Sequence, residues 1–348
     1  MLSPAERLTG MNLEGGWKVI TSIENDVNST GGNFSKCYKV KNKDGKEAFL
    51  KALDFSRALN ALDPALQLKL ITEAFVFERD ILHKCRDENL DHVVVAIEDG
   101  TVRIENAGDI GVVQYLIFEM ADGDVRKQAD VNERFDTAFS LRALHNIAVG
   151  LQQLHKHGIA HQDLKPSNVL VFNNKTKSKI ADFGRSAYKG HFPPHEEYVV
   201  AGDPTYAPPE LLYDYIDSDW NRRRLGCDAY LLGSMAVFFF LGIGMTPLLR
   251  QELHESFVWR NWGGTFNEAI PYLNDAFQRV LVRYSEALPA SLKGELVEIV
   301  SQLCMPDPSL RGHPRTRITS QYSLERYVSK FDLMAKRAEL GLLDSITS

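Results

Sequence analysis

The chain contains few cysteines and no pair of them at the spacing of a metal or redox motif. Its four cysteines, Cys37, Cys85, Cys227 and Cys304, are scattered along 348 residues. Disulfide frameworks and thiolate metal sites depend on cysteines at recurring short spacings. The sequence therefore argues against both, and free thiols in a reducing compartment are the simpler interpretation.

The sequence also lacks a long hydrophobic run and a strong excess of charge. Its longest apolar stretch, around Met235 to Met245, is shorter than the roughly 20 residues that a membrane helix needs. The first ten residues include Glu6 and Arg7 and have no apolar segment typical of a secretory signal. A formal net charge of −6 disfavours a general binder of nucleic acids or anionic membranes. We therefore expect a cytoplasmic protein whose partners include no nucleic acid and no membrane.

The first third of the chain is rich in predicted strands. Alternating apolar and polar residues predict strands at 17–20, 37–40 and 48–53, and Asp44-Gly45 is a turn signal between the last two. Further strands are expected at 93–97 and 115–120, and a helix free of glycine and proline at 66–84. We place a boundary after Ala121, where a polar stretch ends this strand-rich region.

The rest of the chain is predicted to be mostly helical. Apolar residues at three- and four-residue steps predict an amphipathic helix over 141–154, with Gly158 suited to its C-terminal cap. Residues 228–241 are almost wholly apolar and predict a buried helix, and residues 323–340 predict a closing amphipathic helix. The pattern indicates an α+β chain with an N-terminal part, 1–121, that holds an antiparallel sheet and one main helix, and a helical C-terminal part, 122–348.

Two acidic motifs in the C-terminal part carry the chemistry. The stretch HQDLKPSN at 161–168 is followed by ADFG at 181–184, so that Asp163, Lys165, Asn168 and Asp182 fall in one short region. Phosphoryl transfer from a nucleotide needs one carboxylate to orient the attacking hydroxyl and a second to hold the metal ion. It also needs an amide oxygen for the metal and a lysine to neutralise developing charge.

In order and spacing, these motifs resemble the catalytic loop and magnesium motif of the protein kinase family. The resemblance implies a two-lobed protein kinase-like fold and an enzyme that uses ATP with Mg²⁺, or alternatively Mn²⁺. It implies that Asp163 orients the substrate hydroxyl, that Lys165 contacts the γ-phosphate, and that the metal is held by Asn168 and Asp182. Lysine within Asp-Leu-Lys-Pro resembles the serine/threonine branch, so the expected substrates are proteins with serine or threonine acceptors.

The same resemblance assigns ATP-binding roles in the N-terminal part. Lys51 resembles the lysine that contacts the α- and β-phosphates and pairs with a glutamate of the following helix. Glu73 and Glu78 compete for that pairing, and aligning Ile81-Leu82 with the apolar pair that usually closes this helix favours Glu73.

The nucleotide itself is expected to contact a loop and a hinge. The stretch TGGNFSKC at 30–37 takes the place of the glycine-rich loop, with Gly31, Gly32 and Phe34 expected near the phosphates. Two of that motif's three glycines are missing, because it reads threonine at 30 and serine at 35. By the resemblance, Glu119 and Ala121 present backbone groups to adenine.

Three further matches concern the architecture around the catalytic loop. The stretch APPE ending at Glu210 resembles the end of the activation segment, and Asp228 opens a helix that resembles the one anchoring the catalytic loop. Arg311 resembles the arginine that, in the family, pairs with the glutamate at the position of Glu210.

Two departures bear on regulation. Gln162 replaces an arginine that in the family receives a phosphate from the activation segment, and Asp203 replaces a threonine that bridges Asp163 and Lys165. Because glutamine is neutral and can form hydrogen bonds without a phosphate, we expect no need for phosphorylation of this segment. Control would then come from abundance, a regulatory protein partner or the C-terminal helix.

Two other function classes stay open. A pseudokinase scaffold that binds nucleotide without efficient turnover is favoured by the incomplete glycine loop and by Asp203, and opposed by the intact catalytic motifs. A small-molecule kinase of the same general fold ranks third, because the APPE stretch, Asp228 and Arg311 resemble features of protein kinases.

Overall fold

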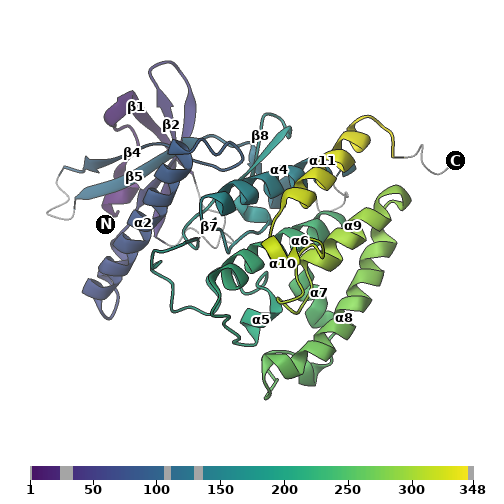
Figure 1. The fold of residues 1–348 in the computed structure, drawn as a ribbon. Coiled ribbons are helices and arrows are strands. Elements are labelled where there is room, and N and C mark those ends of the chain that lie inside the picture. Colours follow the sequence, from purple (N-terminus) through teal and green to yellow (C-terminus); the bar gives the residue numbers. More distant parts are fainter. Residues whose placement is uncertain (1, 24–33, 106–110, 129–135, 344–348) are drawn as a thin grey trace. The chain divides into compact units, whose positions relative to one another are not determined.

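The chain folds into two compact units, which are coloured by position along the sequence in Figure 1. The computed structural model describes residues 2–23, 34–105, 111–128 and 136–343. The first unit comprises Met1–Asp122 together with Ala181–Gly184, and the second comprises Gly123–Ile180 and Arg185–Ser348. This division follows Asp122, whereas the boundary predicted from the sequence follows Ala121 and leaves 181–184 in the C-terminal part.

The first unit is built on a five-stranded antiparallel sheet with the strand order β1-β2-β3-β5-β4. Its strands are β1 Trp17–Ile23, β2 Ser35–Asn42, β3 Glu47–Leu53, β4 Ala96–Arg103 and β5 Val112–Glu119. The Asp44-Gly45 turn joins β2 and β3, and Gly45 has a φ of +83°, which glycine adopts without a steric penalty. The antiparallel sheet predicted from the sequence is therefore confirmed.

One predicted strand was misplaced. Residues 93–97 overlap β4 only at Ala96 and Ile97, and β4 then continues to Arg103 through a glycine. Val93 and Val94 are buried although they precede the strand. Burial outside a strand gives the same apolar pattern as burial within one, so the pattern alone did not locate the start of β4.

A core of apolar side chains lies on one face of this sheet. Leu50 and Ala52 of β3 are fully buried there, together with Tyr38 of β2, whose hydroxyl donates to the carbonyl of Ala5 at 2.6 Å. Successive residues of a strand point to opposite faces. Lys51 therefore points away from this core.

The main helix of the first unit is α2, Pro64–Asp87, preceded by the short α1, Ser56–Leu59. Asp63 caps α2, because its side chain accepts a hydrogen bond from the backbone N–H of Leu66 at 3.0 Å, and Pro64 occupies the first helical position. The predicted helix at 66–84 is thus confirmed and extended by about one turn.

The second unit is mostly helical, as predicted. Its helices are α3 Val125–Gln128, α4 Thr137–Lys156, α5 Pro209–Leu212, α6 Gly226–Leu241, α7 Met245–Glu252, α8 Phe266–Ala287, α9 Ala290–Leu303, α10 Arg317–Ser320 and α11 Glu325–Glu339. Short strands flank the catalytic motifs: β6 Gly123–Asp124, β7 Ile159–Ala160, β8 Val169–Phe172, β9 Lys177–Ile180 and β10 Ala187–Tyr188. A 3-10 turn, η3, covers Pro166–Asn168, and a π-helical turn, η4, covers Asn221–Leu225.

Helix α4 ends just before the predicted catalytic loop. Gly158 follows the end of α4 with a φ of +72°, the left-handed conformation expected of a residue that stops a helix. Helix α11, drawn in yellow in Figure 1, packs along α4. Arg142 of α4 fastens the two helices by ion pairs to Asp332 at 3.0 Å and Glu339 at 2.7 Å. The predicted closing helix is therefore confirmed, and Arg142 adds a polar link to the apolar contact.

Helix α6 is buried almost throughout its length. Within the described part of the chain, only the segment Asn221–Leu241 is long and apolar enough to be a candidate for a membrane span, and 83% of its most apolar window is buried inside the protein. A core helix accounts for that composition, as predicted for residues 228–241.

Candidate active site

In the first unit, Lys51 of β3 and Glu78 of α2 form an ion pair. The Nζ atom of Lys51 lies 2.9 Å from both carboxylate oxygens of Glu78, which is itself buried. Burial by itself lowers the pKa of Lys51, but the negative charges of Glu78 and Asp182 outweigh it and raise that pKa above its usual value. Lys51 is thus held as a cation in a fixed direction.

The prediction that Glu73 pairs with Lys51 is wrong. The Glu73 side chain is 49% exposed, and its carboxylate lies 3.8 Å from a lysine one turn earlier on the helix surface. Phe75, Glu78 and Leu82, at spacings of three and four residues, form part of the buried face of α2, and Glu73 lies off that face. The apolar periodicity of the helix is the signal that identifies Glu78. Aligning one apolar pair by family resemblance shifted the partner by five residues.

The segment Ala181–Gly184 belongs to the first unit. Asp182 has a φ of +68°, a conformation uncommon for a residue other than glycine, and the side chain of Phe183 is buried. Strained backbone persists where the surrounding structure holds it, and it occurs often at functional sites. The negative charge of Asp182 raises the pKa of Lys51, so the two side chains interact electrostatically within the first unit.

The remaining ATP-binding residues predicted in the first unit are only partly described. Gly31 and Gly32 lie outside the described residues. Phe34 directly precedes β2, and its side chain is 40% exposed. Strand β5 ends at Glu119, so Ala121 lies beyond the sheet, and both residues are half-buried. Their contact with nucleotide stays a prediction.

Three of the four predicted catalytic residues belong to the second unit, and these three lie together. Asp163 accepts two hydrogen bonds from Nδ2 of Asn168. This atom lies 2.8 Å from the backbone carbonyl oxygen of Asp163 and 3.1 Å from Oδ2 of Asp163. The Nζ atom of Lys165 lies 3.1 Å from the same Oδ2. All three side chains are buried. The loop therefore holds a carboxylate between an ammonium group and an amide.

The hydrogen bonds of Asn168 fix which end of its side-chain amide is the acceptor. Because its Nδ2 donates to Asp163, its Oδ1 is the acceptor of that amide, and it accepts from the hydroxyl of Ser167 at 3.5 Å. Oxygen atoms of carboxylates and amides are the ligands that magnesium takes in proteins. Asn168 in the second unit and Asp182 in the first unit each carry an oxygen ligand of the kind that suits magnesium.

Asp203 lies beside both Asp163 and Lys165, as the family resemblance of the sequence implies. Its backbone N–H donates to Oδ1 of Asp163 at 2.7 Å, and its carboxylate lies 3.5 Å from Nζ of Lys165. Gly202 allows this approach, because a Cβ atom there would be 2.5 Å from the carbonyl oxygen of Gln162. Lys165 is thus shared by two carboxylates.

The catalytic loop is fastened to α6 through Asp228. One carboxylate oxygen of Asp228 accepts from the backbone N–H of Gln162 at 2.7 Å, and the other accepts from that of His161 at 2.8 Å. His155 lies 2.9 Å from this second oxygen. Gln162 has a φ of +63°, so these bonds hold a strained backbone directly before Asp163.

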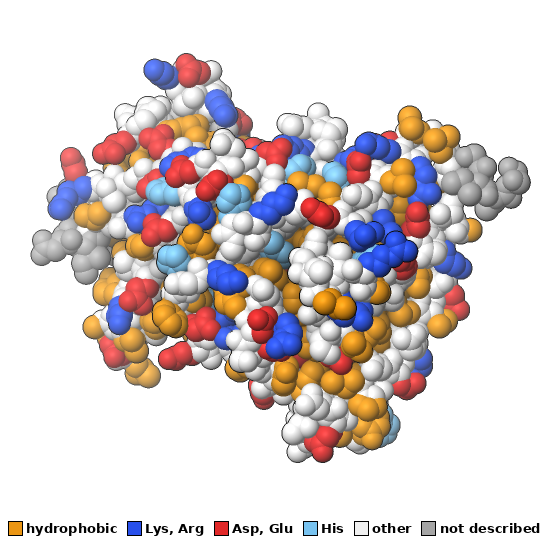
Figure 2. All heavy atoms as spheres, in the orientation of Figure 1, with side chains coloured by type: hydrophobic (Ala, Val, Ile, Leu, Met, Phe, Trp, Pro, Cys, Tyr) orange, Lys and Arg blue, Asp and Glu red, His pale blue; other side chains and the backbone are white. Residues whose placement is uncertain are grey.

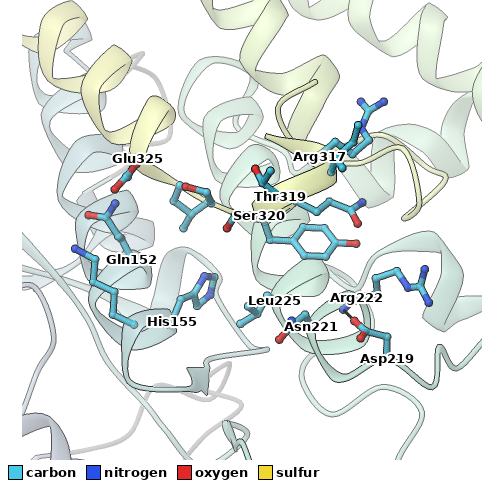
Figure 3. Close-up of a pocket in the computed structure, with 16 residues that line it drawn as sticks. Gln152, His155, Asp219, Asn221, Arg222, Leu225, Arg317, Thr319, Ser320 and Glu325 are labelled. Atoms are coloured by element: carbon cyan, nitrogen blue, oxygen red, sulfur yellow. Dashed lines mark hydrogen bonds between the residues drawn. The ribbon is translucent and has the colours of Figure 1, made fainter. Parts of the chain in front are cut away.

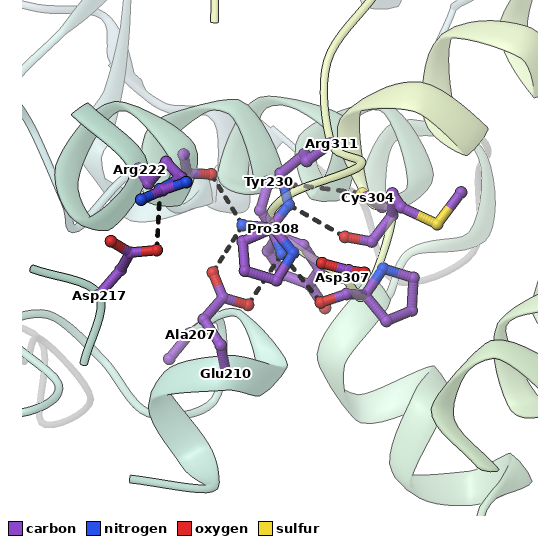
Figure 4. Close-up of polar contacts among 12 residues, drawn as sticks. Ala207, Glu210, Asp217, Arg222, Tyr230, Cys304, Asp307, Pro308 and Arg311 are labelled. Carbon is purple, nitrogen blue, oxygen red and sulfur yellow. Dashed lines mark hydrogen bonds and ion pairs between the residues drawn. The ribbon is translucent and has the colours of Figure 1, made fainter. Parts of the chain in front are cut away.

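A second anchor joins α5 to the loop after α9 (Figure 4). The two guanidinium Nη atoms of Arg311 lie 2.6 and 2.8 Å from the two carboxylate oxygens of Glu210. Burial lowers the pKa of Arg311, but the charge of Glu210 outweighs it and raises that pKa. The predicted pairing of these residues is observed, and the cation stays charged in the core.

Away from these motifs, a cavity of about 460 Å³ lies in the second unit among α4, η4 and the α10 region (Figure 3). Its wall includes the basic residues Lys156 and Arg222 and the acidic residues Asp219 and Glu325. Figure 2 likewise shows acidic and basic side chains interspersed on one face of the molecule. The mixture favours no single class of charged ligand at either place.

A protein family model resembles this chain over most of its length, and several known proteins resemble parts of it. The family model described as "Protein kinase domain" matches residues 30–323. Aurora/IPL1-related protein kinase 2 of Caenorhabditis elegans is 30% identical over 129 residues, which are 37% of this chain and 39% of that protein. Serine/threonine-protein kinase greatwall of Danio rerio is 29% identical over 159 residues, which are 45% of this chain and 16% of that protein.

A third relative covers more of this chain. CBL-interacting protein kinase 26 of Oryza sativa subsp. japonica is 26% identical over 231 residues, which are 65% of this chain and 40% of that protein. In each of these three comparisons, the match spans less than half of the relative's length.

Proposed function

Because the chain belongs to the protein kinase family, we propose that it is an ATP-dependent serine/threonine protein kinase, which transfers the γ-phosphoryl group to hydroxyls of protein substrates. The observation that carries this proposal is the buried cluster of Asp163, Lys165 and Asn168. The charged pair of Lys51 and Glu78 supports it from the other unit.

Asp163 is the group that receives the acceptor hydroxyl. Its Oδ1 is fixed by the N–H of Asp203 and its Oδ2 by Lys165 and Asn168, so the carboxylate has a single orientation. A carboxylate held in this way accepts the hydrogen bond of a substrate hydroxyl and directs the oxygen lone pair at the phosphorus atom. Lys165 lies beside it and supplies positive charge where the transferred group gains negative charge.

Nucleotide binding falls to the first unit. Lys51 is the cation for the α- and β-phosphates, and Glu78 keeps its side chain charged and directed. Asn168 and Asp182 would supply oxygen ligands to magnesium, which when bound neutralises charge on the phosphate oxygens.

We also propose that the activity needs no phosphorylation of the segment between Gly184 and Pro208. Both polar groups of the Gln162 side chain have partners within the chain, because Nε2 donates to the carbonyl of Arg185 at 2.9 Å and Oε1 accepts from Arg224. An arginine at this position would need an added anion, whereas this glutamine does not.

For the cell, we propose a cytoplasmic enzyme that acts on protein substrates, binds no nucleic acid or membrane, and responds to a regulatory protein partner. The net charge of −6 and the burial of the apolar α6 support the absence of nucleic acid and membrane partners.

The test is direct transfer of phosphate. Purified chain is incubated with labelled ATP, magnesium and a generic basic protein, and phosphosites are mapped by mass spectrometry. The Asp163→Asn variant, prepared in parallel, is the control for a contaminating kinase. We expect phosphoserine and phosphothreonine with the wild type alone. Nucleotide binding without transfer to any acceptor would support the pseudokinase alternative instead.

A further inference from the structure

Glu196 lies between two consecutive arginines of the second unit. Its Oε1 is 2.6 Å from an Nη atom of Arg223, and its Oε2 is 2.6 Å from an Nη atom of Arg224. Arg223 also donates to the backbone carbonyl of Glu196 at 3.1 Å. Both carboxylate oxygens and the carbonyl of one residue in the 185–208 segment are therefore tied to η4.

Arg224 is an unusual partner because its side chain is only 3% exposed. Burial, reinforced by the neighbouring charge of Arg223, lowers the pKa of Arg224 from its usual value. A buried guanidinium requires an anion and full hydrogen bonding. Glu196 supplies the anion, and the side-chain oxygen of Gln162 accepts a further hydrogen bond from Arg224.

Gln162 continues this network to the other end of the segment. Its Nε2 donates to the carbonyl of Arg185, the first residue after the Ala181–Gly184 motif. Its backbone N–H is held by Asp228, and Asp163 is the next residue in the chain. The contacts thus run from Glu196 through Arg224 and Gln162 to Arg185, and they pass directly beside the candidate catalytic carboxylate.

We infer that Glu196 is a positioning residue whose own carboxylate, in place of a phosphate group, locks the 185–208 segment onto the catalytic loop through Arg224 and Gln162. The catalytic consequence of this lock rests on the proposed kinase function, but the lock itself does not. The anion that orders the segment is a glutamate side chain and not a phosphate group. A kinase or phosphatase acting on this segment therefore neither adds nor removes the anion at Arg224.

The neighbouring histidine is consistent with this assignment. His195 is buried, and desolvation together with Arg185 and Arg224 lowers its pKa to about 4. It is therefore neutral near pH 7 and adds no positive charge beside Arg224. A protonated His195 therefore does not compete with Arg223 and Arg224 for the carboxylate of Glu196.

An ordinary surface ion pair would contribute little to the order of the segment. Glu196 differs because its removal leaves the charge of Arg224 buried without an anion. We therefore compare Glu196→Gln, which keeps the shape and removes the charge, with Glu197→Gln. Glu197 is the adjacent, exposed glutamate, so its variant controls for a change of net charge in the same segment.

The first measurement is kinetic. For Glu196→Gln we expect kcat with a protein acceptor to fall at least tenfold while KM for ATP stays within about twofold, since Lys51 and Glu78 lie in the other unit. Glu197→Gln should match the wild type. A Glu196→Gln variant with wild-type kcat would overturn the inference, and so would a wild-type enzyme that loses its rate on exhaustive dephosphorylation.

The second measurement does not depend on activity. Hydrogen–deuterium exchange of peptides within 185–208 should be faster in Glu196→Gln than in the wild type, and unchanged in Glu197→Gln. Equal exchange in all three proteins would overturn the lock. If the wild type phosphorylates no acceptor, the proposed kinase function fails, yet the exchange comparison still decides the inference.

A third variant protects the test against simple misfolding. Arg224→Lys keeps a cation but loses the paired geometry that a guanidinium offers, and it is combined with Glu196→Gln in a double-mutant cycle. If the two residues act through one another, the double variant should show the same exchange rate and the same kcat as the more impaired of the two single variants. If the fold-loss of kcat in the double variant equals the product of the fold-losses in the two single variants, the residues are not coupled and the inference is overturned.

Discussion

Arg311 and Glu210 stand 101 positions apart in the chain and meet as a buried ion pair in which both guanidinium Nη atoms face both carboxylate oxygens. Arg311 also donates to the carbonyls of Gly226 and Met305, each at 3.0 Å. One side chain therefore joins the start of α5, the start of α6 and the loop after α9. The chain directly after the 185–208 segment is therefore anchored at Glu210 by this single arginine.

Arg311→Met should destabilise the second unit strongly. Removing one partner of a buried pair leaves the other charge without compensation, at a cost of about 3–5 kcal/mol. Urea unfolding of the wild type and the variant measures the difference. Lys330→Gln is the control, because its pair with Glu298 is partly exposed and its loss should cost no more than about 1 kcal/mol. Equal effects of the two substitutions would contradict the assigned importance of burial.

Glu78→Gln should lower kcat/KM for ATP-dependent transfer by roughly tenfold or more, because Lys51 loses the charge that directs it. Glu73→Gln is the matched control on the same helix, and its activity should equal that of the wild type. Steady-state kinetics with ATP as the varied substrate distinguishes them. A loss with Glu73→Gln and none with Glu78→Gln would mean that the ion pair in the structure is not the functional one.

These two glutamates show what could be predicted from the sequence and what could not. The catalytic loop was predictable because Asp163, Lys165 and Asn168 lie within six consecutive residues, so their proximity is fixed by the chain itself. The partner of Lys51 lies on a different element, and its choice depends on how α2 is rotated against the sheet. The burial of Phe75 and Leu82 on the face of Glu78 settles that rotation in the structure.

The contacts of Glu196 could not be predicted from the sequence, for a related reason. Nothing in the spacing of Glu196, Arg223 and Arg224 indicates that they meet, since the contact requires the chain to return over 27 and 28 residues. Helices α7 to α9 carried no motif and were not assigned from the sequence, although α8 has an apolar face. Elements with a distinctive local pattern were predicted, and tertiary contacts were predicted only where family motifs marked both partners, as for Glu210 and Arg311.

Asp163→Asn and Asp182→Asn should separate two steps of the proposed reaction. Asp163 acts on the acceptor hydroxyl, so its substitution should abolish transfer while nucleotide affinity stays nearly unchanged. Asp182 is assigned to the metal, so its substitution should weaken magnesium-dependent nucleotide binding as well as transfer. Titration with a fluorescent ATP analogue, with and without magnesium, measures affinity, and labelled phosphate measures transfer. Near-normal transfer by Asp163→Asn would refute the assigned role.

The stability of the protein should fall as the pH decreases from about 6.5 towards 4, in part because of His195. Desolvation, with the charges of Arg185 and Arg224 opposing the nearby Glu196, lowers the pKa of His195 from 6.5 to about 4 in the folded protein. Between those two values the unfolded chain binds a proton that the folded chain does not, so acidification favours unfolding.

Each unit of pKa difference corresponds to about 1.4 kcal/mol, and carboxylates titrate over the same range, so the prediction concerns a difference between proteins. Melting temperatures are measured from pH 7.5 to 4.5 for the wild type, His195→Gln and His191→Gln. His191 is the exposed histidine of the same segment. The curve of His195→Gln should be flatter than that of the wild type, and the curve of His191→Gln should be parallel to it. Parallel curves for all three would show that His195 is not held neutral by its buried position.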